Sequence, residues 1–110
     1  MPRQLGITTL INAASADETI GTISCDGNVS NLRFDVIGVG TTSSGVITLA
    51  CAHDKTYAGT WSTLTTVNAS DVSGGAVKSV FAQGCFDAIQ ARISTIIGGG
   101  GTITVIVTGN

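Results

Sequence analysis

Short stretches in which apolar and polar residues alternate recur along this chain, and they restrict its fold more than any other feature. The clearest covers residues 31–39, where Leu32, Phe34 and Val36 would point to one side of an extended chain. About eight such stretches are separated by Gly, Asn, Asp and Ser, which turns prefer. We therefore expect an all-β fold, an antiparallel β-sandwich that is jelly-roll-like and has about eight strands.

The composition agrees with this interpretation. The 110 residues include 16 Thr and 10 Ser but a single Pro. Thr, Val and Ile suit a pleated strand, whereas the strong helix formers Lys, Glu and Met are scarce. A chain of this length is typical of one domain. We expect one β-sandwich domain over residues 1–110, in which residues 1–17 form an N-terminal arm or the first strand.

Residues 86–97 fit two secondary structures. Phe86, Ile89 and Ile93 recur at helical spacing, while Ile89, Ala91 and Ile93 also fit the alternation of a strand. The β-branched residues that end this segment favour the strand.

Two glycine-containing segments are expected to form turns. Residues 26–28 read Asp-Gly-Asn, a combination common in tight turns. The run Gly98–Gly101 lacks the Lys-Ser/Thr pair of a phosphate-binding loop and precedes an expected strand, so it indicates a hairpin turn.

Charge and hydropathy exclude several classes of protein. Only 11% of the residues are charged and the net charge is −2, which argues against a nucleic-acid-coating protein and predicts no nucleic-acid partner. The sequence contains no run of 18 apolar residues, so it predicts no membrane-spanning helix. The first residues also lack the apolar core of a signal peptide. We therefore expect no membrane association and folding in a cytosol.

The three cysteines, Cys25, Cys51 and Cys85, are far apart in the sequence and form no metal-binding motif. We interpret them as reduced, mostly buried small hydrophobic residues. A disulfide between two of them is the alternative.

No catalytic constellation stands out. His53 is the only histidine and precedes Asp54, but no nucleophile elbow accompanies them, so His53 is interpreted as a residue at a strand end. The seven carboxylates are scattered and do not indicate a glycosidase pair or a calcium loop. The sequence predicts neither an enzyme nor a cofactor or metal site.

Aromatic residues suggest one possible contact site for a ligand or a partner. Tyr57 and Trp61 lie close to Asp54 and Lys55, and exposed aromatic rings there would suit the stacking platform of a carbohydrate-binding module. A single Trp at the start of a strand is more typical of a core anchor of a sandwich, and we interpret Trp61 in this way, with the ligand contact as the alternative.

The last expected strand is apolar on nearly both faces. Residues 102–107 alternate Ile or Val with Thr and Ile, which suits a strand covered on two sides. We expect a subunit interface at this strand. Its residues would be Ile103, Thr104, Val105, Ile106 and Val107.

Several motifs in this chain occur together in one known family. Residues 47–54 and the Gly-Thr-Trp-Ser-Thr-Leu of residues 59–64 resemble a strand, an Asp-containing loop and a second strand in the family of small bacteriophage virion proteins. Residues 84–92 resemble its next strand, and residues 98–109 its Gly-rich turn and last strand. The similarity covers residues 29–109.

The resemblance implies a structural protein of a phage particle, assembled in the host cytoplasm. It implies a capsid decoration, or cement, protein, with a tail, baseplate or fibre component as the alternative. The implied partner is the major capsid protein or another virion protein. Because oligomers of small domains are commonly symmetric, we expect a homo-oligomer and favour a trimer. A carbohydrate-binding β-sandwich module is the alternative from another functional class.

Overall fold

The computed structural model describes residues 5–110, apart from the side chains of residues 5, 26–28 and 85. The described chain is almost entirely strand, with one short 3-10 helix, η1. The elements are β1 Leu5–Ala14, β2 Ile20–Val39, β3 Ser44–Ala52, β4 Ser62–Asn68, η1 Ala69–Val72, β5 Val77–Gly98 and β6 Thr102–Gly109.

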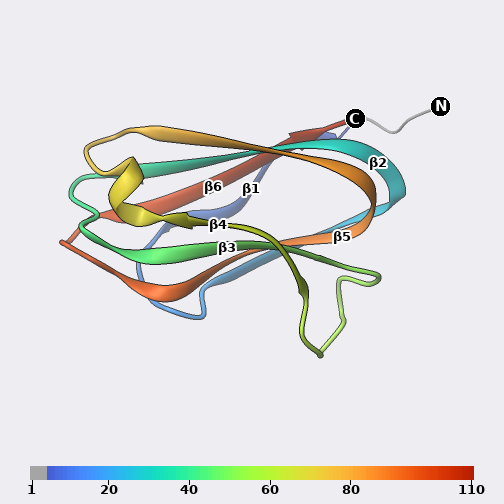
Figure 1. The fold of residues 1–110 in the computed structure, drawn as a ribbon, viewed down its shortest axis with the longest axis horizontal. Coiled ribbons are helices and arrows are strands. Elements are labelled where there is room, and N and C mark those ends of the chain that lie inside the picture. The colour runs from blue at the N-terminus through green and yellow to red at the C-terminus, as the bar shows by residue number, and fades with distance from the viewer. Residues whose placement is uncertain (1–4) are drawn as a thin grey trace.

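The strands follow the order β1-β6-β2-β5-β3-β4 and pair antiparallel. Strands β2 and β5 contain 20 and 22 residues and bend together at one end of the molecule, so each belongs to two layers (Figure 1). The first layer contains β1, β6, residues 31–39 of β2 and residues 77–83 of β5. The second contains residues 20–24 of β2, residues 88–98 of β5, β3 and β4.

This architecture confirms the expected all-β sandwich and its jelly-roll character. Counting β2 and β5 once in each layer turns the six continuous strands into the eight segments of a jelly roll. Residues 86–97 lie within β5, so the strand interpretation of this segment is confirmed. The run Gly98–Gly101 forms the β5–β6 turn, where Gly99 and Gly100 have φ of 100° and 86°.

The prediction of a turn at residues 26–28 is wrong. These residues continue the backbone of β2, and the register with β5 shifts between Ser24 and Val29 instead. The chain therefore passes from one layer to the other by bending a continuous pair of strands, and a bulged register gives such a pair its extra twist.

One hydrophobic core fills the space between the layers. Phe34 and Val36 from β2 meet Ile47 and Leu49 from β3 in the cluster of buried residues. The predicted alternation of residues 31–39 is confirmed, because Leu32, Phe34 and Val36 are all buried.

The expected interface along β6 needs a correction for three of its five residues. Ile103, Val105 and Val107 have no exposed surface and belong to the core, because β6 lies between β1 and β2 and alternates its side chains. Only Thr104 and Ile106 reach the outer surface of the first layer, where both are half-buried.

Two of the cysteines can be placed. Cys25 is buried in the core, and Cys51 is half-buried with a free thiol whose pKa is raised by desolvation. The side chain of Cys85 lies outside the described part of the chain. Within residues 5–110, no helix has the length and apolar character needed to cross a membrane.

Candidate functional site

The loop that joins β3 to β4, residues 53–61, folds back on itself through its own hydrogen bonds. The Asp54 carboxylate accepts bonds from the Thr56 amide and hydroxyl, both at 2.9 Å, and the Tyr57 amide donates to the Asp54 carbonyl at 3.1 Å. Such a turn initiated by an Asp side chain fixes a short loop locally. The loop therefore holds its aromatic residues in a defined place beside the second layer.

The two aromatic residues of this loop are tied to each other. The Trp61 indole Nε1 donates to the Tyr57 carbonyl at 3.0 Å. The Tyr57 ring packs against His53, with ring centroids 4.9 Å apart, and lies so close to Gly59 that a Cβ there would be 2.2 Å from its hydroxyl. Trp61 is half-buried and lies outside the core cluster, so the structure places it at the surface and not as a core anchor.

A groove of about 350 Å³ lies between this loop and the outer surface of the second layer. Small-ligand sites typically have volumes of ~300–1,000 Å³, so the groove is at the small end of that range. Its aromatic wall comes from the loop and its polar floor from three strands of the sheet. The lining residues are Ile20, Thr48, Ala50, Tyr57, Ala58, Gly59, Thr60, Trp61, Thr63, Gln90 and Arg92.

The sheet register explains which side chains form the floor. Thr48 pairs with Arg92, and Ala50 pairs with Gln90, so these four residues form two neighbouring rows on one face. Gln90 and Arg92 are separated by one residue of β5 and therefore point to the same side. The residue between them, Ala91, points into the core, where it is fully buried.

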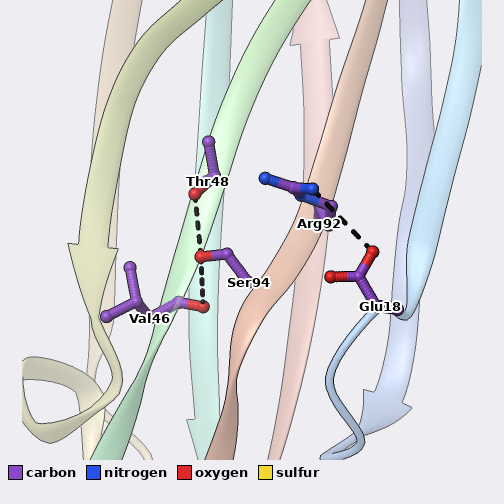
Figure 2. A network of polar contacts seen from close by, with 5 residues as sticks. All are labelled: Glu18, Val46, Thr48, Arg92 and Ser94. Atoms are coloured by element: carbon purple, nitrogen blue, oxygen red, sulfur yellow. Dashed lines mark hydrogen bonds and ion pairs between the residues drawn. The ribbon is translucent and has the colours of Figure 1, made fainter. Parts of the chain in front are cut away.

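A chain of hydroxyl groups borders this floor (Figure 2). The Ser94 hydroxyl donates to the Val46 carbonyl at 3.2 Å and lies 2.9 Å from the Thr48 hydroxyl. Because a hydroxyl has one proton to donate, Thr48 must be the donor to Ser94. The Thr48 oxygen thus keeps acceptor capacity at the edge of the groove.

Among the described residues that line the groove, Arg92 is the only charged one, and an acidic residue accompanies it (Figure 2). Glu18 lies 3.8 Å from Arg92, and its backbone amide donates to the Ile93 carbonyl at 2.8 Å. Both side chains are partly exposed, so this pair contributes little to stability. Its effect is to balance the charge at this end of the groove.

The structure divides the four candidate contact residues between two hollows. Tyr57 and Trp61 line the groove, whereas Asp54 and Lys55 face a separate polar hollow. His53 lines that hollow too, together with Ser24 and Asp87. Among the described residues, no group of three or more His, Cys, Asp or Glu side chains is placed to hold a metal ion.

Asp54 gives a prediction about pH. Its pKa lies below its usual value of 3.8, first because the Thr56 amide and then the Thr56 hydroxyl donate to it, with small contributions from the charges of His53 and Lys55. A lowered pKa in the folded state stabilises the fold above pH 3.8, and this stabilisation is lost as the pH falls through the folded-state pKa. Thr56→Val should raise the pKa of Asp54 part of the way towards 3.8, because the amide bond remains.

A carbon-detected NMR titration of the Asp54 carboxyl group measures this change. Thr66→Val, at an exposed position in β4, is the control and should leave the pKa of Asp54 unchanged. An identical titration curve for Thr56→Val and the unmodified chain would contradict the assigned hydroxyl bond.

The outer surface of the first layer has a different character. It presents six apolar side chains from four strands, which we call the apolar sheet face: Ile7, Ile37, Val39, Val77, Phe81 and Ile106. Ile7 and Phe81 are the most exposed of these, at 78% and 74%, and both line a hollow of about 400 Å³.

The charges on the apolar sheet face neutralise each other. Arg33 lies 3.2 Å from Asp35, and Ser79 donates to the Asp35 carboxylate at 2.6 Å. Among the described residues, no other charged side chain projects from the rows that carry the apolar residues. The same rows also carry Ser79, Gln83, Thr104 and Thr108, so this surface combines exposed apolar side chains with hydroxyl and amide groups and is close to electrically neutral.

Neither Gln90 nor Arg92 was a candidate from the sequence. The alternation of residues 86–97 does place both on the polar side of β5. Their proximity to Tyr57 and Trp61 depends on the pairing of β5 with β3, in which Ala50 pairs with Gln90 and Thr48 with Arg92, residues 40 and 44 positions apart in the sequence.

No family model matches the chain, and no curated protein matches it either. One solved structure with some similarity is a glycoside hydrolase family 43 arabinoxylan arabinofuranohydrolase from Bacillus subtilis in complex with cellotetraose. It is 14% identical with a TM-score of 0.45, and the match covers 89% of this chain and 20% of the hydrolase. A second comes from Bacillus endospore appendages, described as a novel family of disulfide-linked pili. It is 16% identical with a TM-score of 0.40, covering 97% of this chain and 90% of the other. This chain spans only a fifth of the hydrolase, and neither comparison assigns a function.

Proposed function

We propose that this chain is a structural protein of a bacteriophage particle and that it decorates the capsid by packing on the major capsid protein. The proposal is supported by the resemblance of residues 29–109 to small virion proteins and by the jelly-roll sandwich, an architecture that capsid proteins use. The observation that carries it is the apolar sheet face.

The chemistry of the apolar sheet face suits a protein partner. Cores of protein interfaces are rich in apolar and aromatic side chains and poor in charge. Phe81 projects from this face as a large, exposed anchor, and the Arg33–Asp35 pair adds no net charge. A nucleic acid would need a basic surface, which this face lacks.

On a repeating shell, each copy of the protein can bind with a lower affinity than a single isolated copy would need. Copies that bind together as one oligomer gain from a high effective concentration, so each individual contact can be small. We include a homotrimer in the proposal, with each protomer directing its apolar sheet face towards the shell. Native mass spectrometry of the purified chain tests this stoichiometry, and a strictly monomeric spectrum at all concentrations would contradict it.

Quantitative mass spectrometry of purified phage particles tests the location. A decoration protein should be present in hundreds of copies, in fixed proportion to the major capsid protein. A handful of copies would assign the chain to the tail, and its absence from the particle would overturn the structural role altogether.

The surface itself is tested with capsids that lack the protein. Adding the purified chain should raise the melting temperature of these capsids, and Phe81→Ser should abolish both binding and the increase. Thr66→Ser, at an exposed position on the second layer, is the control and should bind normally. Normal binding by Phe81→Ser and by a Val77→Ser variant would contradict docking through the apolar sheet face.

A further inference from the structure

The groove beside the 53–61 loop combines an aromatic wall with a polar floor. Tyr57 and Trp61 contribute aromatic rings from the loop, and Gln90 and Arg92 contribute planar polar groups from β5. A sugar ring presents an apolar C–H face to an aromatic side chain and a rim of hydroxyls to polar groups. We infer that this groove binds a neutral carbohydrate.

The polar floor is available for hydrogen bonding. The Gln90 amide makes no side-chain hydrogen bond to any described residue, so both its donors and its acceptor can serve a ligand. Next to it, Arg92 has five N–H donors and only a loose contact of 3.8 Å with Glu18. Thr48 adds an acceptor, since its proton is given to Ser94. A sugar hydroxyl both donates and accepts, and this floor offers both functions.

The charge of the site selects among sugars. Arg92 is the one charged residue in the described lining, and Glu18 beside it carries the opposite charge. A sulfated or sialylated sugar would gain little from a site whose charge is already balanced, and it would approach Glu18. The site therefore suits a neutral sugar.

The aromatic wall is organised before any ligand arrives. The bond from the Trp61 indole to the Tyr57 carbonyl satisfies the indole nitrogen within the loop, so Trp61 offers its ring and not its N–H. The Tyr57 ring packs against His53, and its hydroxyl end lies beside Gly59. Preorganisation of this kind reduces the entropy lost on binding.

The inference is independent of the proposed docking on a capsid, because the groove lies on the second layer and the apolar sheet face on the first. A proline-rich peptide is the other ligand that aromatic surfaces commonly recognise. It needs few polar contacts beyond its backbone, so Gln90, Arg92 and Thr48 make the carbohydrate the better fit.

Trp61 provides a direct readout because it is the only tryptophan in the chain. Its fluorescence is followed while the full chain is titrated with cellotetraose, xylotetraose, maltotetraose or mannotetraose, and separately with sialyllactose and a proline-rich decapeptide. Titration to about 10 mM ensures that a dissociation constant of about 1 mM is still measured. We expect a saturable change with at least one neutral sugar and none with sialyllactose or the peptide.

Paired variants assign the signal to the groove. Gln90→Ala should weaken binding about tenfold. Gln83→Ala is its matched control, since it removes the same side chain from the same strand but in the first layer, and it should bind normally. Tyr57→Ala should also weaken binding about tenfold or more, while its carbonyl still accepts the Trp61 bond; Phe81→Ala is the aromatic control.

Three results would overturn the inference. The first is the absence of any saturable change with all four neutral sugars. The second is a response to sialyllactose or to the peptide alone. The third is sugar binding that Gln90→Ala and Tyr57→Ala leave as strong as in the unmodified chain, because the ligand would then sit elsewhere. Capsid binding measured with the same variants keeps this outcome separate from failure of the decoration role.

Discussion

Phe34→Ala is expected to lower the free energy of unfolding by about 3–5 kcal/mol, the usual cost of truncating a fully buried phenylalanine. Phe34 has no exposed surface and is flanked in the first layer by Val80 of β5 and Val107 of β6. Truncation leaves a cavity between the two layers, because a sandwich held by paired strands cannot collapse freely around it. Small domains have only ~5–15 kcal/mol of stability, so this is a large fraction of the total.

Urea unfolding followed by circular dichroism measures the loss, and Phe81→Ala is its matched control. Phe81 lies on β5, in the same layer, but 74% of its side chain is exposed. Its truncation should change the free energy of unfolding by no more than about 0.5 kcal/mol. If the two variants unfolded at the same urea concentration, the assignment of inward and outward positions in this layer would be wrong.

Much of the fold could be predicted because the alternation of apolar residues depends on local sequence alone. The stretch from Leu32 to Val36 shows its inward side directly, and the number of such stretches indicates an all-β fold of about eight strands. The alternation of residues 86–97 was also informative once their β-branched end was weighed against the helical spacing. In each case, side chains that alternate between a buried face and an outer face are enough to identify the segment as a strand.

Predictions that required tertiary context were less successful. Residues 26–28 have turn chemistry, but the sandwich needs a bend there and not a reversal, so β2 continues through them. The apolar character of β6 suggested an interface, yet Ile103, Val105 and Val107 fill the core because their side chains point towards the second layer. When a strand is apolar on both faces, the sequence alone does not reveal which face its own domain covers.

The candidate site shows the same limit. Tyr57 and Trp61 line the same groove, because both lie on one short loop. Asp54 and Lys55, equally close in sequence, face the other hollow, since the Asp54 turn reverses the chain between them and the aromatic residues. Hydrogen bonds within a loop decide such directions, and they leave no periodic signal in the sequence.

Gly21→Ala is expected to cost about 1–3 kcal/mol or more, although alanine normally suits a strand better than glycine. An added Cβ at Gly21 would lie 1.8 Å from the Leu10 carbonyl oxygen and 2.4 Å from its carbon. Both are backbone atoms, so no side-chain rotation relieves the contact. Strand β1 would have to move away from β2, and its pairing with β6 would weaken with it.

Gly6→Ala separates this contact from the general effect of losing a glycine. Gly6 lies on β1, and a Cβ there would meet no atom within 4 Å. Neither glycine has a left-handed φ. The Gly6 variant should therefore be neutral or more stable by up to about 1 kcal/mol, because alanine restricts the unfolded chain.

Calorimetry measures both variants, and each kcal/mol should shift the melting temperature by about 4–8 °C in a domain of this size. Hydrogen exchange then locates the change. In Gly21→Ala, the amides of β1 that pair with β6, such as those near Thr9 and Ile106, should lose protection before those between β3 and β5. If amide protection were lost uniformly over both layers, or not at all, the close contact between Leu10 and Gly21 would not be what holds β1 against the second layer.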